Sequence, residues 1–515
     1  MGELTPIPAP ARRDRELSMK KVLVIHVAGL WMQCVGAQVV PTNSTAIPSD
    51  STAMAEGCTH RPWRALGEVA LTCGAVHSFA RYVMKEDYAQ STMHSIRDNV
   101  KSGFAWDDDN FYLNNIGHTY QGSAYFNAAR SNGLSFWQSV PYTFLGALAW
   151  EITCEKEQPS INDMIVTPVS GVLMGEISHR LVPAIVDERE RGAKRATREA
   201  LAAIANPIEG LHRLFSGRMW KVGSSKYTPL CGTASDDDGN TRFAVGLGDR
   251  CIAPANDFAL NTRQPYASFS IEYGNAADGE PHTAIYDYFT VDGAFAFGKR
   301  QHLLSHLDIT GRICSTPVKM NEKTYAELGL YQFFRYEDTH LKGDSTHSPF
   351  PYGEMASFGP GIIFSFPHLS PHIRLVQNLF ARGVVLGAVN SDYYKFHNRT
   401  YNMGTGYGAS STSLLKWENV GSLQMSAYYM HLFTWKGYEP KHPADYTFDN
   451  KHFNVLGDKS HARLLSISLK AIINLSQHMG VAVGASYHSR NTHYKHHENR
   501  RAESCDIHAG LEWDL

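Results

Sequence analysis

Side chains able to do chemistry gather between Trp106 and Glu176 of the 515-residue chain. This stretch interleaves small and aromatic residues with charged and amide groups, and it is apolar enough to be largely buried. Buried ionisable groups must be paired with one another or serve catalysis or binding, so we expect a functional site in this stretch. The candidates for catalysis are His118, Glu151, Glu155 and Asp163. The candidates for binding are Asp109, Asn114, Arg130 and Glu176.

His118 is the central candidate, because an imidazole acts as a general base when a carboxylate fixes its tautomer. Asp109 or Glu151 is available for that role. A GxSxG motif surrounds none of the nearby serines, so the sequence gives no specific sign of a serine hydrolase. In the alternative that we favour, His118 is a core histidine bonded to a backbone carbonyl. Arg130 would then pair with Glu151 or Glu155 and join two helices.

Two Glu-x-x-His motifs raise the question of a metal centre in a helical bundle. They are Glu176–His179 and Glu209–His212. With 25 histidines in the chain, ordinary glutamate usage produces this spacing about once by chance. We therefore expect no metal and no cofactor. The histidine-rich tract His488–His497 is interpreted as a solvated loop or a rim facing lipopolysaccharide, with surface metal capture as the alternative.

The N-terminus has the organisation of a secretory signal. From Met19 the chain shows two lysines, then the apolar run Val22–Met32, then small residues two apart in Val35–Ala37. The apolar run is about half of the roughly 20 residues that a membrane-spanning helix needs, so a cleaved signal is preferred to an anchor. We assign residues 1–37 to the signal with an upstream extension and residues 38–59 to a flexible leader rich in Ser, Thr, Ala and Pro.

Helical spacing dominates residues 60–217, which predicts a helical domain. The expected helices include one near Asn115–Ser131, one that starts at Ser135 with a capping box to Gln138, and one that starts at Ser160. Small residues such as Gly122 keep the first of these helices thin. Gly171 and Gly175 give the third helix a face for close contact.

Residues 218–515 change to a hydrophobic period of two, which predicts a transmembrane β-barrel. In the last ten residues, apolar Ile507, Ala509, Leu511, Trp513 and Leu515 alternate with Asp506, His508, Gly510, Glu512 and Asp514. One face of such a strand meets hydrocarbon and the other meets water or polar filling. About a dozen segments show this pattern, and only a closed barrel satisfies every backbone group in lipid. A soluble β-sandwich is the alternative, but the signal and the length of the strands oppose it.

Four motifs resemble those of an uncharacterised family of exported Gram-negative proteins, a bacterial domain of unknown function. They are WDDDNFYLNNIGHTYQGSAYFNAARSNGLSFW at 106–137, Trp150-Glu151, Pro159–Asp163 and Gly175-Glu176. The resemblance implies a helical N-terminal region followed by outer-membrane-type strands. The family has no established activity, so the resemblance implies a location and an architecture only.

The sequence thus predicts a membrane β-barrel of roughly 12 antiparallel strands, with the helical domain packed in or under the lumen. The expected location is the cell outer membrane, and the expected partners are outer-membrane lipid, lipopolysaccharide and the barrel-assembly machinery. A formal charge of −2 means that the chain has no excess of basic residues of the kind that binds nucleic acid. Two functions stay open. In the first, the protein is a structural, binding or transport barrel, and the helices are its plug or cap. In the second, the helices carry an envelope enzyme with hydrolase or lipid-modifying activity.

Overall fold

The structure is a computed structural model. It describes residues 60–229, 240–257, 262–280, 282, 284–297, 303–321, 324–338, 351–396, 399–439 and 454–515. The predicted signal and leader lie outside these residues. The chain forms two compact units that interleave along the sequence. Among the described residues, unit 1 comprises 60–103, 124–159 and 181–229, and unit 2 comprises 104–123, 160–180 and those from 240 to 515.

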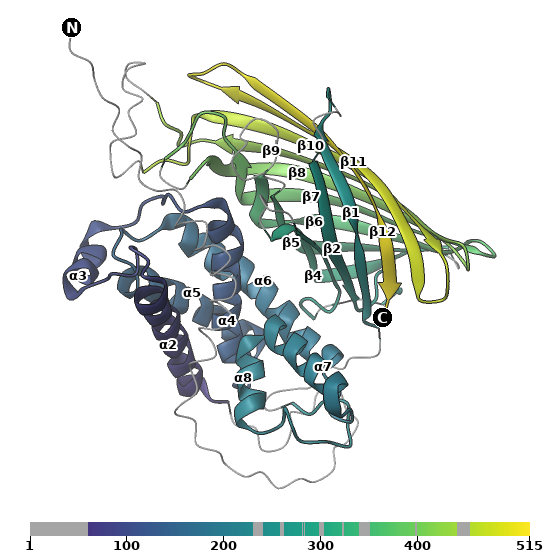
Figure 1. Ribbon diagram of the computed structural model, residues 1–515, viewed down its shortest axis with the longest axis horizontal. Coiled ribbons are helices and arrows are strands. Elements are labelled where there is room, and N and C mark those ends of the chain that lie inside the picture. Colours follow the sequence, from purple (N-terminus) through teal and green to yellow (C-terminus); the bar gives the residue numbers. More distant parts are fainter. Residues whose placement is uncertain are drawn as a thin grey trace. The chain divides into compact units, whose positions relative to one another are not determined.

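The N-terminal half of the described chain is helical (Figure 1). Its elements are α2 (Pro62–Ser78), the π-helical turn η2 (Phe79–Met84), α3 (Met93–Ser102), the π-helical turn η3 (Leu113–Gly117), α4 (His118–Arg130), α5 (Phe136–Thr153), α6 (Ile161–Ile185), α7 (Gly192–Ala205) and α8 (Pro207–Phe215). The predicted capping box is confirmed, because Ser135 and Gln138 each accept a hydrogen bond from the other's backbone N–H. Among the described helices, none is both long and apolar enough to cross a membrane.

Unit 1 has an apolar core. One buried cluster brings Val69 and Cys73 of α2 together with Tyr125 of α4 and Trp150 of α5. The face of α2 that carries Val69 and Cys73 follows the helical spacing of the sequence, so burial of this face holds α2 in place.

Unit 2 is built on a closed antiparallel barrel, and this confirms the predicted fold class. Its strands are β1 (Arg242–Pro254), β2 (Thr262–Tyr273), β3 (Phe289–Ala296), β4 (Leu304–Asn321), β5 (Thr324–Asp338), β6 (Pro351–Ser370), β7 (Ile373–Asn390), β8 (Tyr401–Trp417), β9 (Gly421–Thr434), β10 (Ser460–Asn474), β11 (Met479–Tyr494) and β12 (Arg500–Asp514). Each strand pairs with its sequence neighbours, and β1 pairs with β12 to close the sheet (Figure 1). The closed sheet leaves no unpaired edge.

The two faces of the barrel wall differ in chemistry, as the period of two predicts. On β10, Leu465, Ile467 and Leu469 point outward and are 38%, 39% and 48% exposed. Lys470 has the opposite parity, and its Nζ lies 2.5 Å from Oε2 of Glu512 on β12. The barrel therefore carries apolar side chains outside and ion pairs inside.

The histidine-rich tract is not a loop along most of its length, and the loop interpretation of His488–His497 is wrong there. Strand β11 continues to Tyr494, and His493 is paired with His461 of β10. The apolar alternation of β11 ends before its backbone pairing does, because the residues of β11 from His488 to His493 are polar on both faces.

Two helical segments, Phe104–Ser123 and Ser160–Arg180, belong to the same compact unit as the barrel. They contact β5 and β8 through hydrogen bonds and stacked rings. The contacts join Asn114 Nδ2 to the Tyr401 hydroxyl at 2.6 Å, the Phe111 ring to the Tyr336 ring, and the Val169 carbonyl to Gln332 Nε2 at 2.9 Å. These side chains are far apart in sequence, so the barrel holds the two segments in a defined register.

Candidate functional site

A contact between two glycines brings α4 and α6 together in unit 2. A Cβ on Gly122 would lie 1.8 Å from the carbonyl oxygen of Thr167, and a Cβ on Gly171 would lie 2.6 Å from Cα of Gly122. Only glycine permits this approach, and the predicted close-contact faces are confirmed at these two positions. His118 lies one turn before Gly122 and Asp163 lies in the first turn of α6. The glycine contact therefore places these two side chains at one end of the helix pair.

His118 meets two carboxylates at that end. Its Nε2 lies 3.5 Å from Oδ2 of Asp109 and 3.5 Å from Oδ1 of Asp163. His118 and Asp163 are buried, whereas Asp109 is half-buried. The π-helical turn η3 ends directly before His118, and such turns are frequent at functional sites. The structure thus joins one predicted binding residue to two predicted catalytic residues.

Amide side chains surround this cluster and orient its carboxylates. Asn162 Nδ2 donates to Oδ1 of Asp163 at 3.1 Å and to Oδ1 of Asn114 at 2.7 Å. Asn114 Nδ2 in turn donates to Oδ1 of Asp107 at 3.2 Å. Asp107 and Asn162 were not among the predicted site residues. Their only signal in the sequence is that they lie in the same motifs as Asp109 and Asp163.

Strand β8 and the residues before it hold the loop that carries Asp107 and Asp109. The Arg399 guanidinium donates to the carbonyl oxygen of Asp107, and the Tyr401 hydroxyl donates to the carbonyl oxygen of Asp109 at 3.0 Å. Both side chains are fully buried. They lie nearly 300 residues from the loop in sequence, so local patterns gave no reason to connect them with it.

The carboxylates of the cluster have different electrostatic surroundings. Burial raises the pKa of Asp109 to about 6, since hydrogen bonding to His118 offsets only part of the lost hydration and Asp107 adds repulsion. Burial also acts on Asp107, but hydrogen bonds shared with Asp163, Asn162 and Asn114 outweigh it and lower the pKa of that carboxyl. The two carboxyl groups therefore differ in how readily they lose a proton.

Glu176, a predicted binding residue, lies further along α6 in unit 2. Its Oε1 accepts a hydrogen bond from Nε of Arg180 at 3.0 Å, one turn later. Arg180 also donates to the carbonyl oxygen of Ile285 at 2.8 Å. Glu176 thus helps to hold Arg180 against the loop before β3, and a binding role for it stays a prediction.

Three further candidates belong to unit 1. Arg130 donates to the carbonyl oxygen of Leu134 at 2.8 Å, and Glu155 accepts a hydrogen bond from Trp150 Nε1 at 2.7 Å. Glu151 is buried. The cluster of Asp109, His118 and Asp163 forms within unit 2 without Glu151 and Glu155, and catalytic roles for these two glutamates stay predictions.

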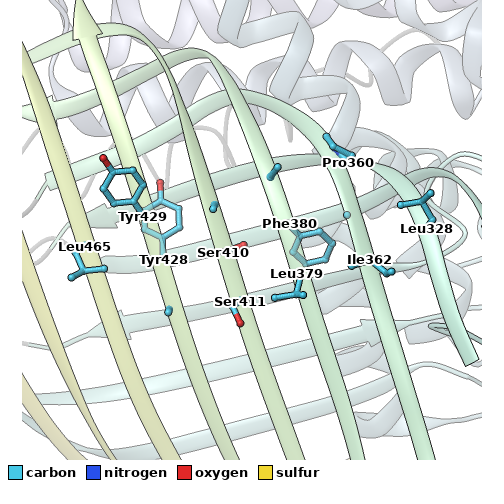
Figure 2. A pocket seen from close by; sticks show the side chains of 14 residues that line it. Leu328, Pro360, Ile362, Leu379, Phe380, Ser410, Ser411, Tyr428, Tyr429 and Leu465 are labelled. Carbon is cyan, nitrogen blue, oxygen red and sulfur yellow. The ribbon is translucent and has the colours of Figure 1, made fainter. Parts of the chain in front are cut away.

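The barrel wall contains a hollow of a different kind. Figure 2 shows its side chains on neighbouring strands, among them Leu328, Leu379 and Leu465, which point outward. Its volume is about 550 Å³. Small residues such as Ala409 and Ala427 line it between the larger ones, and the lining contains no carboxylate, imidazole, amine or guanidinium. This hollow can take up apolar groups but offers nothing for acid–base chemistry.

Comparisons with solved structures find outer-membrane channels. The toluene transporter TodX of Pseudomonas putida is 7% identical, with 53% of this chain and 89% of TodX covered and a TM-score of 0.21. The COG4313 outer membrane channel of Pseudomonas putida F1 is 8% identical, with 53% and 95% covered and a TM-score of 0.25. The outer membrane channel DcaP of Acinetobacter baumannii is 7% identical, with 54% and 96% covered and a TM-score of 0.19.

Comparison with curated proteins finds no match. A family match exists in the part of the chain that contains the site. Residues 103–208 match the domain of unknown function DUF3943, and this confirms the resemblance to a bacterial domain of unknown function.

Proposed function

We propose that this protein is an outer-membrane β-barrel whose helices serve a structural, binding or transport role. The proposal rests on one observation, the closed antiparallel barrel with apolar side chains outside and polar side chains inside. A water-soluble barrel has the opposite arrangement, because its apolar residues fill its interior. Outward leucines and isoleucines such as Leu465, Ile467 and Leu469 would each cost free energy in water, whereas hydrocarbon accommodates them.

The segments Phe104–Ser123 and Ser160–Arg180 are proposed to fill part of the barrel lumen as a plug. Their contacts with Tyr336 and Tyr401, which are fully buried, support this assignment. Polar groups on the inner wall can hydrogen-bond to an inserted helix, as they do between Gln332 and the Val169 carbonyl. A plug held in this way limits passage to small solutes or to solutes that displace it.

Lipid and lipopolysaccharide are the proposed surroundings of the outer wall, and the barrel-assembly machinery is the proposed route of insertion. The signal at residues 19–37 would send the chain across the inner membrane first. Removal of this signal would leave a mature chain that begins with the leader.

Two neighbouring residues of β10 offer a direct test of membrane insertion. Spin labels are attached to Ile467→Cys and to Ser468→Cys in a background without the native cysteines, and the full chain is reconstituted in vesicles. Label at 467 should collide with oxygen, which concentrates in hydrocarbon, whereas label at 468 should not. Equal access of a water-soluble relaxation agent to both labels, or recovery of the mature chain in solution without detergent, would refute the proposal.

An envelope enzyme is the second candidate, favoured by the convergence of His118 with Asp109 and Asp163. His118 is the proposed base, and a lipid headgroup or acyl ester is the proposed class of substrate. Mass spectra of envelope lipids from cells with the wild-type chain and with His118→Gln test this. A lipid species that disappears in the variant, at equal amounts of folded barrel, supports the enzyme; identical spectra count against it.

A further inference from the structure

We propose that Asp109, His118 and Asp163 bind a divalent transition-metal ion, with zinc as the probe for it. One ligand atom of each residue lies within 4.8 Å of the other two. The sequence predicted no metal here, because these positions match no recognised spacing of ligands. The folded chain assembles the set from a loop, the start of α4 and the start of α6.

The distances fit a shared ion, and both are longer than those of strong ion pairs. Charge-assisted hydrogen bonds from nitrogen to carboxylate oxygen are about 2.7–2.9 Å long. His118 Nε2 is 3.5 Å from the oxygen of Asp109 and from that of Asp163. Ligand bonds of about 2.0–2.2 Å place two ligands of one tetrahedral ion roughly 3.4 Å apart. The distance from His118 to each carboxylate oxygen therefore matches that between two ligands of one ion.

Another histidine between two aspartates provides a contrast within the same unit. His282 uses both ring nitrogens: Nδ1 lies 2.9 Å from Oδ2 of Asp287, and Nε2 lies 2.9 Å from Oδ1 of Asp278. Each nitrogen thus has its own carboxylate at hydrogen-bond distance. At His118 both carboxylates face the same nitrogen, which carries at most one hydrogen. A cation can be shared by all three groups, whereas one N–H cannot serve two carboxylates well.

Charge and accessibility agree with a divalent ion. Two carboxylates and a neutral imidazole carry a charge of −2, which one divalent cation balances. Asp163 is held in place by Asn162 and by Ser160, whose Oγ accepts from the Asp163 backbone N–H at 3.1 Å. The side chain of Asp109 is 33% exposed, so one side of the site is open. Three protein ligands with an open position are the pattern of catalytic zinc sites, where water or a substrate oxygen completes the coordination.

Zinc titration of the full-length protein tests the site. Protein purified in detergent with a non-histidine affinity tag is treated with chelator, and Zn²⁺ binding is measured by calorimetry and elemental analysis. We expect one tight site per chain, and we expect His118→Gln and Asp163→Asn to weaken it about 100-fold or more. Histidines of the tract 488–497 cannot account for this difference, because both variants retain them.

His282→Gln is the matched control, since it also removes a histidine between two aspartates. It should leave the tight site unchanged. Cobalt provides a second readout, because Co²⁺ at three protein ligands and water gives visible absorption bands that should vanish in His118→Gln. The proposal is overturned if the wild-type chain has no tight site, if His118→Gln retains it, or if His282→Gln loses it.

Discussion

Two clusters of buried charge, one in each unit, are held in different ways. In unit 1, Arg213 donates to Glu199 at 3.0 and 2.7 Å and to Glu188 at 3.1 Å, and Arg195 lies 2.6 Å from Glu199. Each carboxylate there has a guanidinium at hydrogen-bond distance, and the charges match.

The cluster around His118 in unit 2 has longer contacts. Asp107, Asp109 and Asp163 share the surroundings of one imidazole, and the two contacts of His118 with carboxylates are 3.5 Å long. Short contacts between opposite charges stabilise a fold, whereas three ligand groups spaced more widely around one point leave room for a bound ion. The comparison therefore separates a structural network from a binding site.

Arg213→Met should have the largest effect, a loss of about 3–5 kcal/mol in the free energy of unfolding, because it leaves buried carboxylates without their partner. Denaturant titration of the detergent-solubilised full chain, followed by circular dichroism at 222 nm, measures it. Arg189→Met is the control. Arg189 pairs with Asp187 near the surface, its side chain is 58% exposed, and the free energy of unfolding should stay close to that of the wild type. Equal losses in both variants would mean that the buried network is no stronger than a surface pair.

Gly122→Ala should cost about 1–3 kcal/mol, because the new Cβ would overlap the Thr167 carbonyl and push α4 away from α6. It should also weaken the zinc site, since His118 and Asp163 are on different helices of this pair. Unchanged stability and unchanged zinc affinity would show that the glycine contact does not position the site.

Glu68→Gln should cost about 1–2 kcal/mol at neutral pH. Glu68 accepts hydrogen bonds from His212 at 2.9 Å and from Asn132 at 2.7 Å. Burial alone would raise the pKa of Glu68, but His212 and Arg64 lower it below its ordinary value of 4.5.

Because the folded-state pKa is the lower one, this stabilisation is fully present above about pH 4.5 and is lost as the pH falls through the lowered value. Thermal unfolding of the wild type and of Glu68→Gln, measured from neutral pH to below pH 4.5, checks this pH dependence. The difference between wild type and variant should shrink in acid, and a constant difference would contradict the assigned ionisation.

Gly74→Ala should have the smallest effect, a gain of about 0.5–1 kcal/mol. Gly74 lies on the exposed face of α2, and a Cβ there would meet nothing within 4 Å. The variant separates the general cost of glycine in a helix from the specific need for it at Gly122. A loss of stability here would show that α2 needs glycine for another reason.

Sequence patterns predicted the barrel well and the site only in part. Alternation such as that of Ile507 to Leu515 reports directly which side of a strand meets lipid, so strands could be found one at a time. His118 and Asp163 were selected because buried ionisable residues are rare. Asp109 was one of two carboxylates proposed to orient His118, but nothing in the sequence decided between Asp109 and Glu151 or brought Asp163 to the same nitrogen. That contact depends on the glycine crossing of α4 and α6 and on Arg399 and Tyr401, which hold the loop from a distant part of the chain. Contacts between residues so far apart along the chain leave no pattern in the local sequence.

The most direct test compares Asp109→Asn with Glu199→Gln in the presence of chelator at neutral pH. The midpoint of thermal unfolding is measured for each full-length protein. If the cluster is a binding site, Asp109→Asn removes one of several like charges, and it should unfold at the wild-type temperature or above while Glu199→Gln unfolds well below it. If Asp109→Asn destabilises the protein as much as Glu199→Gln does, the cluster is a structural network like that of Arg213 in unit 1, and the distinction between the two clusters fails.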